Sequence, residues 1–172
     1  MTELPKLRAL VAALKRYRFY GRLLAVDPGE TTGYCVLDVT HESIKLLIQG
    51  QILAWPIERS ITHLTHIFTT QLPTEVVYEA YHIYSWRLEE HRFSEVPTIQ
   101  IIGCLKTLAF QRGLRVSHQT AQVGKSFFKD EMLRRVDMYY EGQPHARDSL
   151  RHALQFITFG PPKHQNDQTP EE

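Results

Sequence analysis

The stretch Leu23–Leu37 constrains the fold most, because two apolar runs are joined there by a Pro-Gly turn. The first run, residues 22–27, carries apolar residues at successive positions and ends in Asp27, and the second is entered through Gly33. Two such runs separated by turn residues predict a β-hairpin. Because the first run is apolar on successive positions instead of alternating, we expect a strand covered on both faces.

Asp27 would therefore stand at the end of a buried strand. A carboxylate left unpaired in a dry environment costs several kcal/mol, so it needs a cation, backbone donors or a metal ion as a partner. Alternatively, Asp27 caps the hairpin through an Asx-turn. This stretch alone leaves both interpretations open.

Length and charge bound the class of protein. The 172 residues fit one domain with its own core, and 20 Lys+Arg against 19 Asp+Glu leave little global attraction to nucleic acid or lipid. Cys35 and Cys104 have no metal-site spacing and sit in apolar context, which favours buried free thiols in a reducing compartment. The chain has no apolar run long enough to span a bilayer and no signal peptide, so we expect a cytoplasmic protein without a membrane partner.

The order of predicted elements is three strands, helix, strand, helix, strand, helix, which indicates an α/β domain with helices on a five-stranded mixed sheet. Residues 1–21 predict a basic helical extension, 22–159 the domain, and 160–172 a polar, disordered tail. After the hairpin, strands are expected at 45–52, 74–79 and 114–118, and helices at 57–73, 98–112, 119–136 and 145–157. The helix over 98–112 is apolar nearly all round, which predicts burial in the core or in a subunit contact.

The fourth strand resembles the first, since it also runs apolar into a terminal acid, Glu79. If the two strands lie side by side and parallel, both acids emerge at one end of the sheet. The last helix can then bring His145 and Asp148 over them, and its spacing puts His152 on the same face. Three carboxylates and an imidazole suit Mg²⁺ or Mn²⁺. Two such ions about 3.5–4 Å apart can clamp the attacking and leaving oxygens of a phosphodiester.

Each of these residues also has an ordinary interpretation. Glu79 can be a surface acid at a strand end, Asp148 an acid favoured by the helix dipole, and His145 an N-terminal helix residue. The coincidence of two strand-end acids with a His-x-x-Asp helix start favours the site.

Three segments carry a family resemblance: Val26-Asp27-Pro28-Gly29 with Gly33, Val77-Tyr78-Glu79, and His145-Ala146-Arg147-Asp148. They resemble the acidic motifs of RuvC-type Holliday junction resolvases, especially the short phage-encoded branch, in the ribonuclease H-like superfamily. The resemblance covers roughly residues 22–158. It implies a ribonuclease H-like fold and a homodimer that cuts four-way DNA symmetrically. It also implies that two Mg²⁺ ions, or Mn²⁺ in their place, are held by Asp27, Glu79, His145 and Asp148.

The same resemblance implies DNA contacts. Gln122-Val123-Gly124-Lys125 is similar to the family's Val-Lys segment, which would place Lys125 near the scissile phosphate. An aromatic residue after the second acid would enter the junction centre, and no candidate matches uniquely. The residues expected to contact DNA are Tyr81, His82, Tyr84, Trp86, Arg87, Lys106, Arg112 and Lys129. We expect the apolar helix over 98–112 to be the dimer face.

Other functions stay open at this point. A nuclease of the same fold that acts on flaps, forks or RNA–DNA hybrids would share these acids. A phosphate binder of the actin or hexokinase type would need a duplicated domain, and a noncatalytic DNA-binding module would not need the complete acid set.

Overall fold

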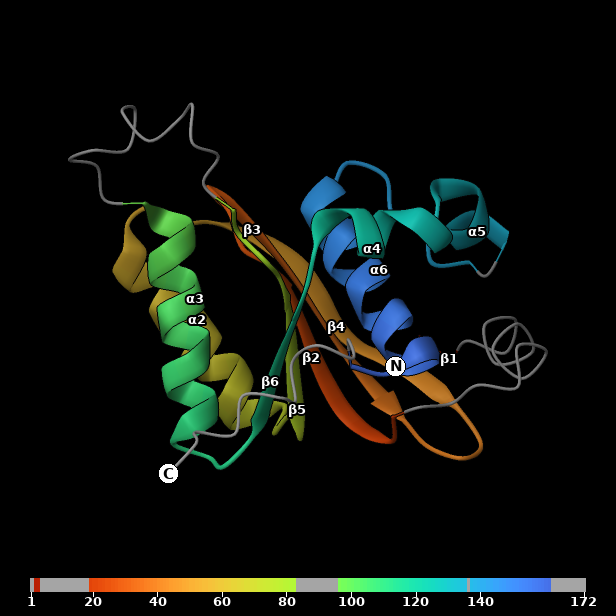
Figure 1. Ribbon diagram of the computed structural model, residues 1–172, viewed down its shortest axis with the longest axis horizontal. Helices are drawn as coiled ribbons and strands as arrows, with labels where there is room; N and C mark the ends of the chain where they lie inside the picture. The colour runs from red at the N-terminus through yellow and green to blue at the C-terminus, as the bar shows by residue number, and fades with distance from the viewer. Residues whose placement is uncertain (1, 4–18, 83–95, 136, 162–172) are drawn as a thin grey trace, which may run out of the picture.

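The computed structural model describes residues 2–3, 19–82, 96–135 and 137–161, with a mixed sheet between two layers of helices (Figure 1). The sheet order is β1-β4-β3-β2-β5-β6. Its strands are β1 (Thr2–Glu3), β2 (Gly21–Asp27), β3 (Thr31–Val39), β4 (Ile44–Leu53), β5 (Glu75–Glu79) and β6 (Arg115–Gln119).

The predicted hairpin is β2 and β3, which pair antiparallel with Asp27 opposite Gly33. The other expected pairing is also present, since β5 lies parallel to β2 with Leu23 opposite Glu75 and Val26 opposite Tyr78. Strand β6 continues the sheet in parallel beside β5. The carboxyl ends of β2, β5 and β6 therefore meet at one end of the sheet.

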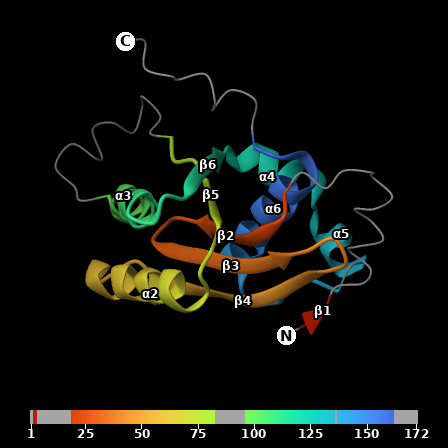
Figure 2. The same ribbon diagram turned by 90° about the horizontal axis from the view of Figure 1, so that it is seen from below.

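Helices cover both faces of the sheet (Figures 1 and 2). One face carries α2 (Ile57–Thr70) and α3 (Pro97–Phe110), and the other carries α4 (Ala121–Phe127), α5 (Asp130–Arg135) and α6 (Pro144–Phe159). None of the helices in this part of the chain is long and apolar enough to cross a membrane.

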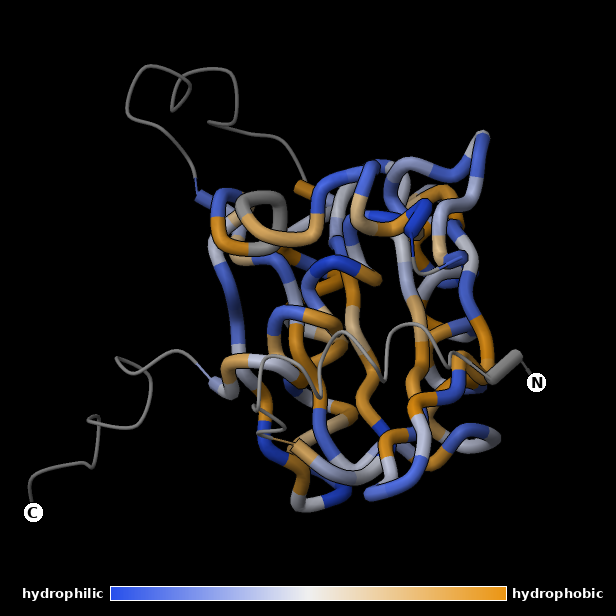
Figure 3. Tube along the Cα trace, turned by 90° about the vertical axis from the view of Figure 1, so that its right-hand side faces the viewer, coloured by the Kyte–Doolittle hydropathy of each residue, from blue (hydrophilic) through white to orange (hydrophobic). Residues whose placement is uncertain are grey.

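The sheet separates two hydrophobic clusters. Along β2, Leu23 and Ala25 pack with α6, whereas Leu24 and Val26 pack with α2 and α3. Successive strand residues point to opposite faces, which explains why a strand covered on both sides is apolar at every position. Hydrophobic and hydrophilic residues are interspersed along the chain in Figure 3.

The structure confirms the α/β class and the five predicted strands, and it adds the two-residue strand β1 at the sheet edge beside β4. One helical prediction needs correction. The stretch 119–136 holds two short helices, because the chain leaves helical geometry at Phe128, whose side chain is buried in the core. Helix α3 buries one face in the core and leaves Phe110 84% exposed, so burial in a subunit contact stays a prediction. The basic extension and the tail lie almost wholly outside the described residues.

Candidate active site

Asp27 and Glu79 are the last residues of the neighbouring parallel strands β2 and β5. Asp27 points to the same face of the sheet as Leu23 and Ala25 of β2, and Glu79 points to the same face as Val77 of β5. These three apolar residues pack against α6. Both acids are thus directed to the α6 side of the sheet end. The parallel pairing expected from the sequence is what brings them there.

The start of α6 lies directly on the hairpin at Gly33. A Cβ atom on Gly33 would lie 2.0 Å from the backbone oxygen of His145. Only a residue without a side chain permits this approach, and Gly33 is the register partner of Asp27. The glycine of the first motif therefore seats the His-x-x-Asp helix above the first acid.

Asp27 is 8% exposed and holds the imidazole of His145, with 2.9 Å between Asp27 Oδ2 and His145 Nδ1. Burial raises the pKa of the Asp27 carboxyl above its usual range, and the charge of Glu79 raises it further. The hydrogen bond and charge of His145 oppose this shift, and Asp148 adds to it. Asp27 therefore lies within electrostatic reach of both other predicted acids.

Glu79 is held by His152, for which no role is predicted from the sequence. His152 is fully buried on α6, and its Nε2 lies 2.8 Å from Glu79 Oε2. Its Nδ1 lies 2.8 Å from Oε1 of Gln119, the last residue of β6. The placement of His152 on the same helix face as His145 was the available signal. Gln119 gave none, because a strand-end glutamine is usually a surface residue.

Asp148 pairs with Arg151 one turn further along α6, and the same guanidinium also binds Asp130 at the start of α5. Arg151 Nε donates to the backbone oxygen of Phe128 at 3.0 Å. The Arg151 side chain is 12% exposed, so it is largely packed inside the domain. This arginine ties the third acid to the α4–α5 segment.

The carboxylates of Asp27, Glu79 and Asp148 are of the ligand type that suits a divalent cation. Carboxylate oxygens are the ligands that Mg²⁺ prefers. Burial is the main cause of the raised pKa of Asp27, and the charges of Glu79 and Asp148, which a cation would offset, add to it. In the described part of the chain, however, no three His, Cys, Asp or Glu side chains are close enough to hold a metal ion. Each acid instead pairs with a basic side chain: Asp27 with His145, Glu79 with His152, and Asp148 with Arg151.

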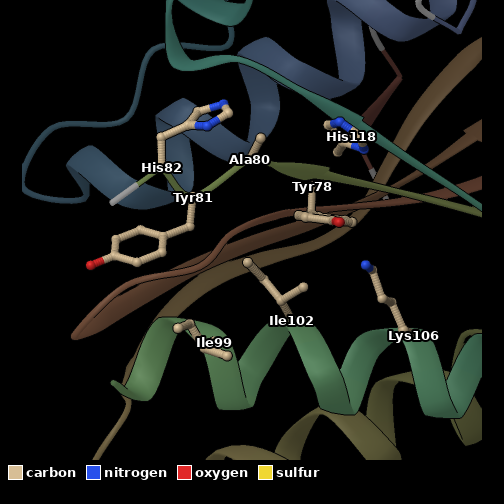
Figure 4. Close-up of a pocket in the computed structure, with 8 residues that line it drawn as sticks. All are labelled: Tyr78, Ala80, Tyr81, His82, Ile99, Ile102, Lys106 and His118. Atoms are coloured by element: carbon tan, nitrogen blue, oxygen red, sulfur yellow. The ribbon is translucent and has the colours of Figure 1, made fainter. Parts of the chain in front are cut away.

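The residues expected to contact DNA are spread over the structure. Tyr81, His82 and Lys106 line one pocket on the α3 side of the sheet end (Figure 4). Lys129 is exposed between α4 and α5. Arg112 follows the far end of α3, where its Nη1 donates to the backbone oxygen of Leu108.

For the remaining predicted residues, the side chains lie outside the part of the chain that the structure describes. Lys125 belongs to α4 by its backbone. Tyr84, Trp86 and Arg87 lie outside the described residues, so the predicted aromatic wedge stays a prediction.

Comparison with known proteins gives the fold. No protein-family model matches the sequence, and no curated protein is significantly similar to it. Among solved structures, Thermus thermophilus RuvC in complex with Holliday junction substrate aligns with a TM-score of 0.63 at 19% identity, over 80% of this chain and 94% of that one.

Two further resolvases align. Fowlpox virus resolvase, in a complex with substrate Holliday junction DNA, has a TM-score of 0.53 at 14% identity, over 78% of this chain and 97% of that one. The yeast mitochondrial Holliday junction resolvase Ydc2 has a TM-score of 0.57 at 12% identity, over 88% and 83%. The chain thus has the ribonuclease H-like fold of RuvC-type proteins.

Proposed function

We propose that this protein is a metal-dependent endonuclease that resolves four-way DNA junctions by paired phosphodiester cuts. The observation that carries the proposal is the position of Asp27 and Glu79 at the ends of neighbouring parallel strands beneath the start of α6, with Asp148 near enough to affect the pKa of Asp27. Structural neighbours that are themselves junction resolvases support the same assignment.

In this proposal Asp27, Glu79 and Asp148 hold divalent cations, two Mg²⁺ or Mn²⁺ per site, and His145 completes the ligand set. Bound there, the ions would activate water and stabilise the charge that develops on the phosphate. For them to bind, the acids must exchange their present basic partners for the ions. The side chain of His145 is 41% exposed, so its ring has room to turn from Asp27 Oδ2 towards a bound ion.

The chain's own residues have separate tasks. Burial of Asp27 keeps water from competing for its oxygens, and His152 with Gln119 fixes the position of the Glu79 carboxylate. Lys125 is proposed to neutralise charge on the scissile phosphate.

A junction presents two symmetry-related strands, so a twofold dimer is the natural assembly. Phe110, the last residue of α3, is 84% exposed. We assign the dimer contact to this end of α3, with Phe110 as its main exposed apolar residue.

The test compares a mobile four-way junction with a linear duplex of the same sequence, in Mg²⁺ and in EDTA. We expect paired nicks on the junction alone, lost in EDTA and in Asp27→Asn while junction binding survives. Asp38→Asn is the matched control, because Asp38 pairs with Arg22 near the opposite end of the sheet.

Cleavage by Asp27→Asn at the wild-type rate would refute the metal-site assignment. Preferred cleavage of a flap or an RNA–DNA hybrid would retain the nuclease and refute the junction as its substrate.

A further inference from the structure

A cavity of about 320 Å³ opens at the same end of the sheet as the acids but on its other face (Figure 4). Tyr78 and Glu79 are successive residues of β5, so their side chains point to opposite sides. Glu79 meets α6, whereas Tyr78 joins the cluster under α2 and α3. The cavity is therefore separate from the acids and only the thickness of the sheet away from them.

One end of the cavity is basic. Lys106 Nζ lies 6.0 Å from the centroid of the Tyr78 ring, and the His118 ring lies 5.8 Å from the same centroid. His82 lines the cavity as well, and its described lining contains no Asp or Glu. Burial lowers the pKa of His118, and the charges of Lys106 and His82 lower it further. An anion at this end would relieve the crowding of like charges.

The other end is mainly apolar, with His82 beside Tyr81 in Figure 4. In Figure 4, Ile99 and Ile102 rise from α3, and Tyr81 faces them from the chain that follows β5. An inorganic anion would use the basic end alone. An aromatic base can pack between the side chains of Ile99 and Ile102 and the ring of Tyr81. Bases stack on aromatic side chains in this way in single-strand binding sites. The volume lies at the lower end of the range of small-molecule pockets, about 300–1,000 Å³.

We propose that this cavity binds one unpaired nucleotide of a DNA strand. The base would pack against Tyr81, Ile99 and Ile102, and the phosphate would lie against Lys106 and His118. The proposal rests on the proposed function for its ligand class, since branched DNA exposes unpaired nucleotides at the branch. It assigns His118 and Tyr78 to a binding site and gives Lys106 a defined task.

The test uses the full chain, in EDTA, and a fluorescein-labelled single-stranded tetramer of thymidylate followed by fluorescence anisotropy. We expect saturable binding that Lys106→Gln and Tyr81→Ala each weaken by about tenfold, which for Tyr81 is in the lower part of the range for one stacked base. Lys45→Gln is the matched control, because Lys45 lies opposite Asp38 at the far end of the sheet. Unlabelled thymidine monophosphate should compete better than thymidine or inorganic phosphate.

Equal binding by wild type, Lys106→Gln and Tyr81→Ala would overturn the proposal. So would competition by inorganic phosphate as strong as that by thymidine monophosphate, since the cavity would then be a plain anion site. If Lys106→Gln changed the oligomeric state instead of tetramer binding, the cavity would belong to a contact between copies of the chain.

Failure of the proposed function gives a different pattern. In that case wild-type protein leaves junctions uncut, and tetramer binding still depends on Lys106. If instead the junction is cut and the tetramer binds independently of Lys106, the nucleotide-pocket proposal is refuted and the proposed function is retained. Asp38→Asn should bind the tetramer as wild type does, because Asp38 lies opposite Lys45 at the far end of the sheet.

Discussion

His152 Nε2 lies 2.8 Å from Glu79 Oε2, and this contact joins the buried face of α6 to the end of β5. An ionised carboxylate only accepts hydrogen bonds, so the imidazole donates from Nε2. The other ring nitrogen is hydrogen-bonded to Gln119, so the ring is fixed from both sides. Glu79 therefore presents its second oxygen in a defined direction.

We expect His152→Leu to raise the Mg²⁺ concentration that cleavage requires. Residues that orient a metal-binding carboxylate are worth about 10–100-fold in metal affinity or activity. His152→Gln keeps a donor and should recover part of the loss, which a purely structural role would not predict. The measurement is the Mg²⁺ concentration for half-maximal junction cleavage, with urea unfolding as the control for stability. An unchanged half-maximal concentration in His152→Leu would refute the role of this residue.

The raised pKa of Asp27 predicts how stability changes with pH in EDTA. The folded protein keeps the Asp27 proton to higher pH than the unfolded chain does, whose carboxyl titrates near 3.8. The free energy of unfolding therefore falls as the pH rises from that value through the raised pKa. Asp27→Asn lacks this penalty, so its stability relative to wild type should increase between pH 4 and pH 7. Urea unfolding at both pH values tests this, and a relative stability that decreases over this range would contradict it.

Mg²⁺ should reverse this order of stabilities. An ion that binds only the folded state at ten times its dissociation constant contributes about 1.4 kcal/mol, which corresponds to about 3–5 °C in melting temperature for a chain of this size. Wild type and Asp38→Asn should show the rise, and Asp27→Asn and Glu79→Gln should not. Thermal unfolding at matched ionic strength measures it, and a similar rise in all four proteins would indicate binding elsewhere.

The sequence was sufficient to predict most of the fold and the placement of Asp27 and Glu79 at the ends of neighbouring strands. Residues 22–39 contain two apolar strand runs with turn residues between them. The order of elements allowed the parallel pairing of β2 with β5, which brings Asp27 and Glu79 to the same end of the sheet. These predictions depend on local pattern and chain order alone.

The partners of the acids depend on packing and could not be predicted in the same way. Spacing put His152 on the face of His145, but only the packing of α6 on β5 shows that it meets Glu79. Arg151 reaches Asp130, which is 21 positions away in the sequence. The apolar character of α3 did not distinguish burial from exposure, because Leu105 and Phe110 are equally apolar and only one is buried.

Gly33→Ala should displace α6 from the hairpin. Its Cβ would lie 2.0 Å from the His145 oxygen, so backbone must move, and overpacking of this kind costs about 1–3 kcal/mol. Cleavage should fall with it, since the displaced residues include a proposed ligand. Gly103→Ala is the matched control, since its Cβ meets no atom within 4 Å and a mid-helix alanine gains about 0.5–1 kcal/mol. Urea unfolding midpoints compare the two, and a neutral Gly33→Ala would show that the contact tolerates a methyl group.

Two substitutions on α3 distinguish a residue of the proposed dimer contact from a residue of the hydrophobic core. Phe110 is 84% exposed and Leu105 is fully buried, so Phe110→Glu should yield a folded monomer, whereas Leu105→Glu should unfold the domain because it buries an unpaired charge. Leu72→Glu is the control, since Leu72 is 63% exposed outside α3 and its substitution should leave the dimer intact. Sedimentation velocity with far-ultraviolet circular dichroism gives both readouts. A Phe110→Glu protein that sediments as wild type does would exclude this end of α3 as the contact, and the second copy that paired cleavage needs would then have to dock through another surface.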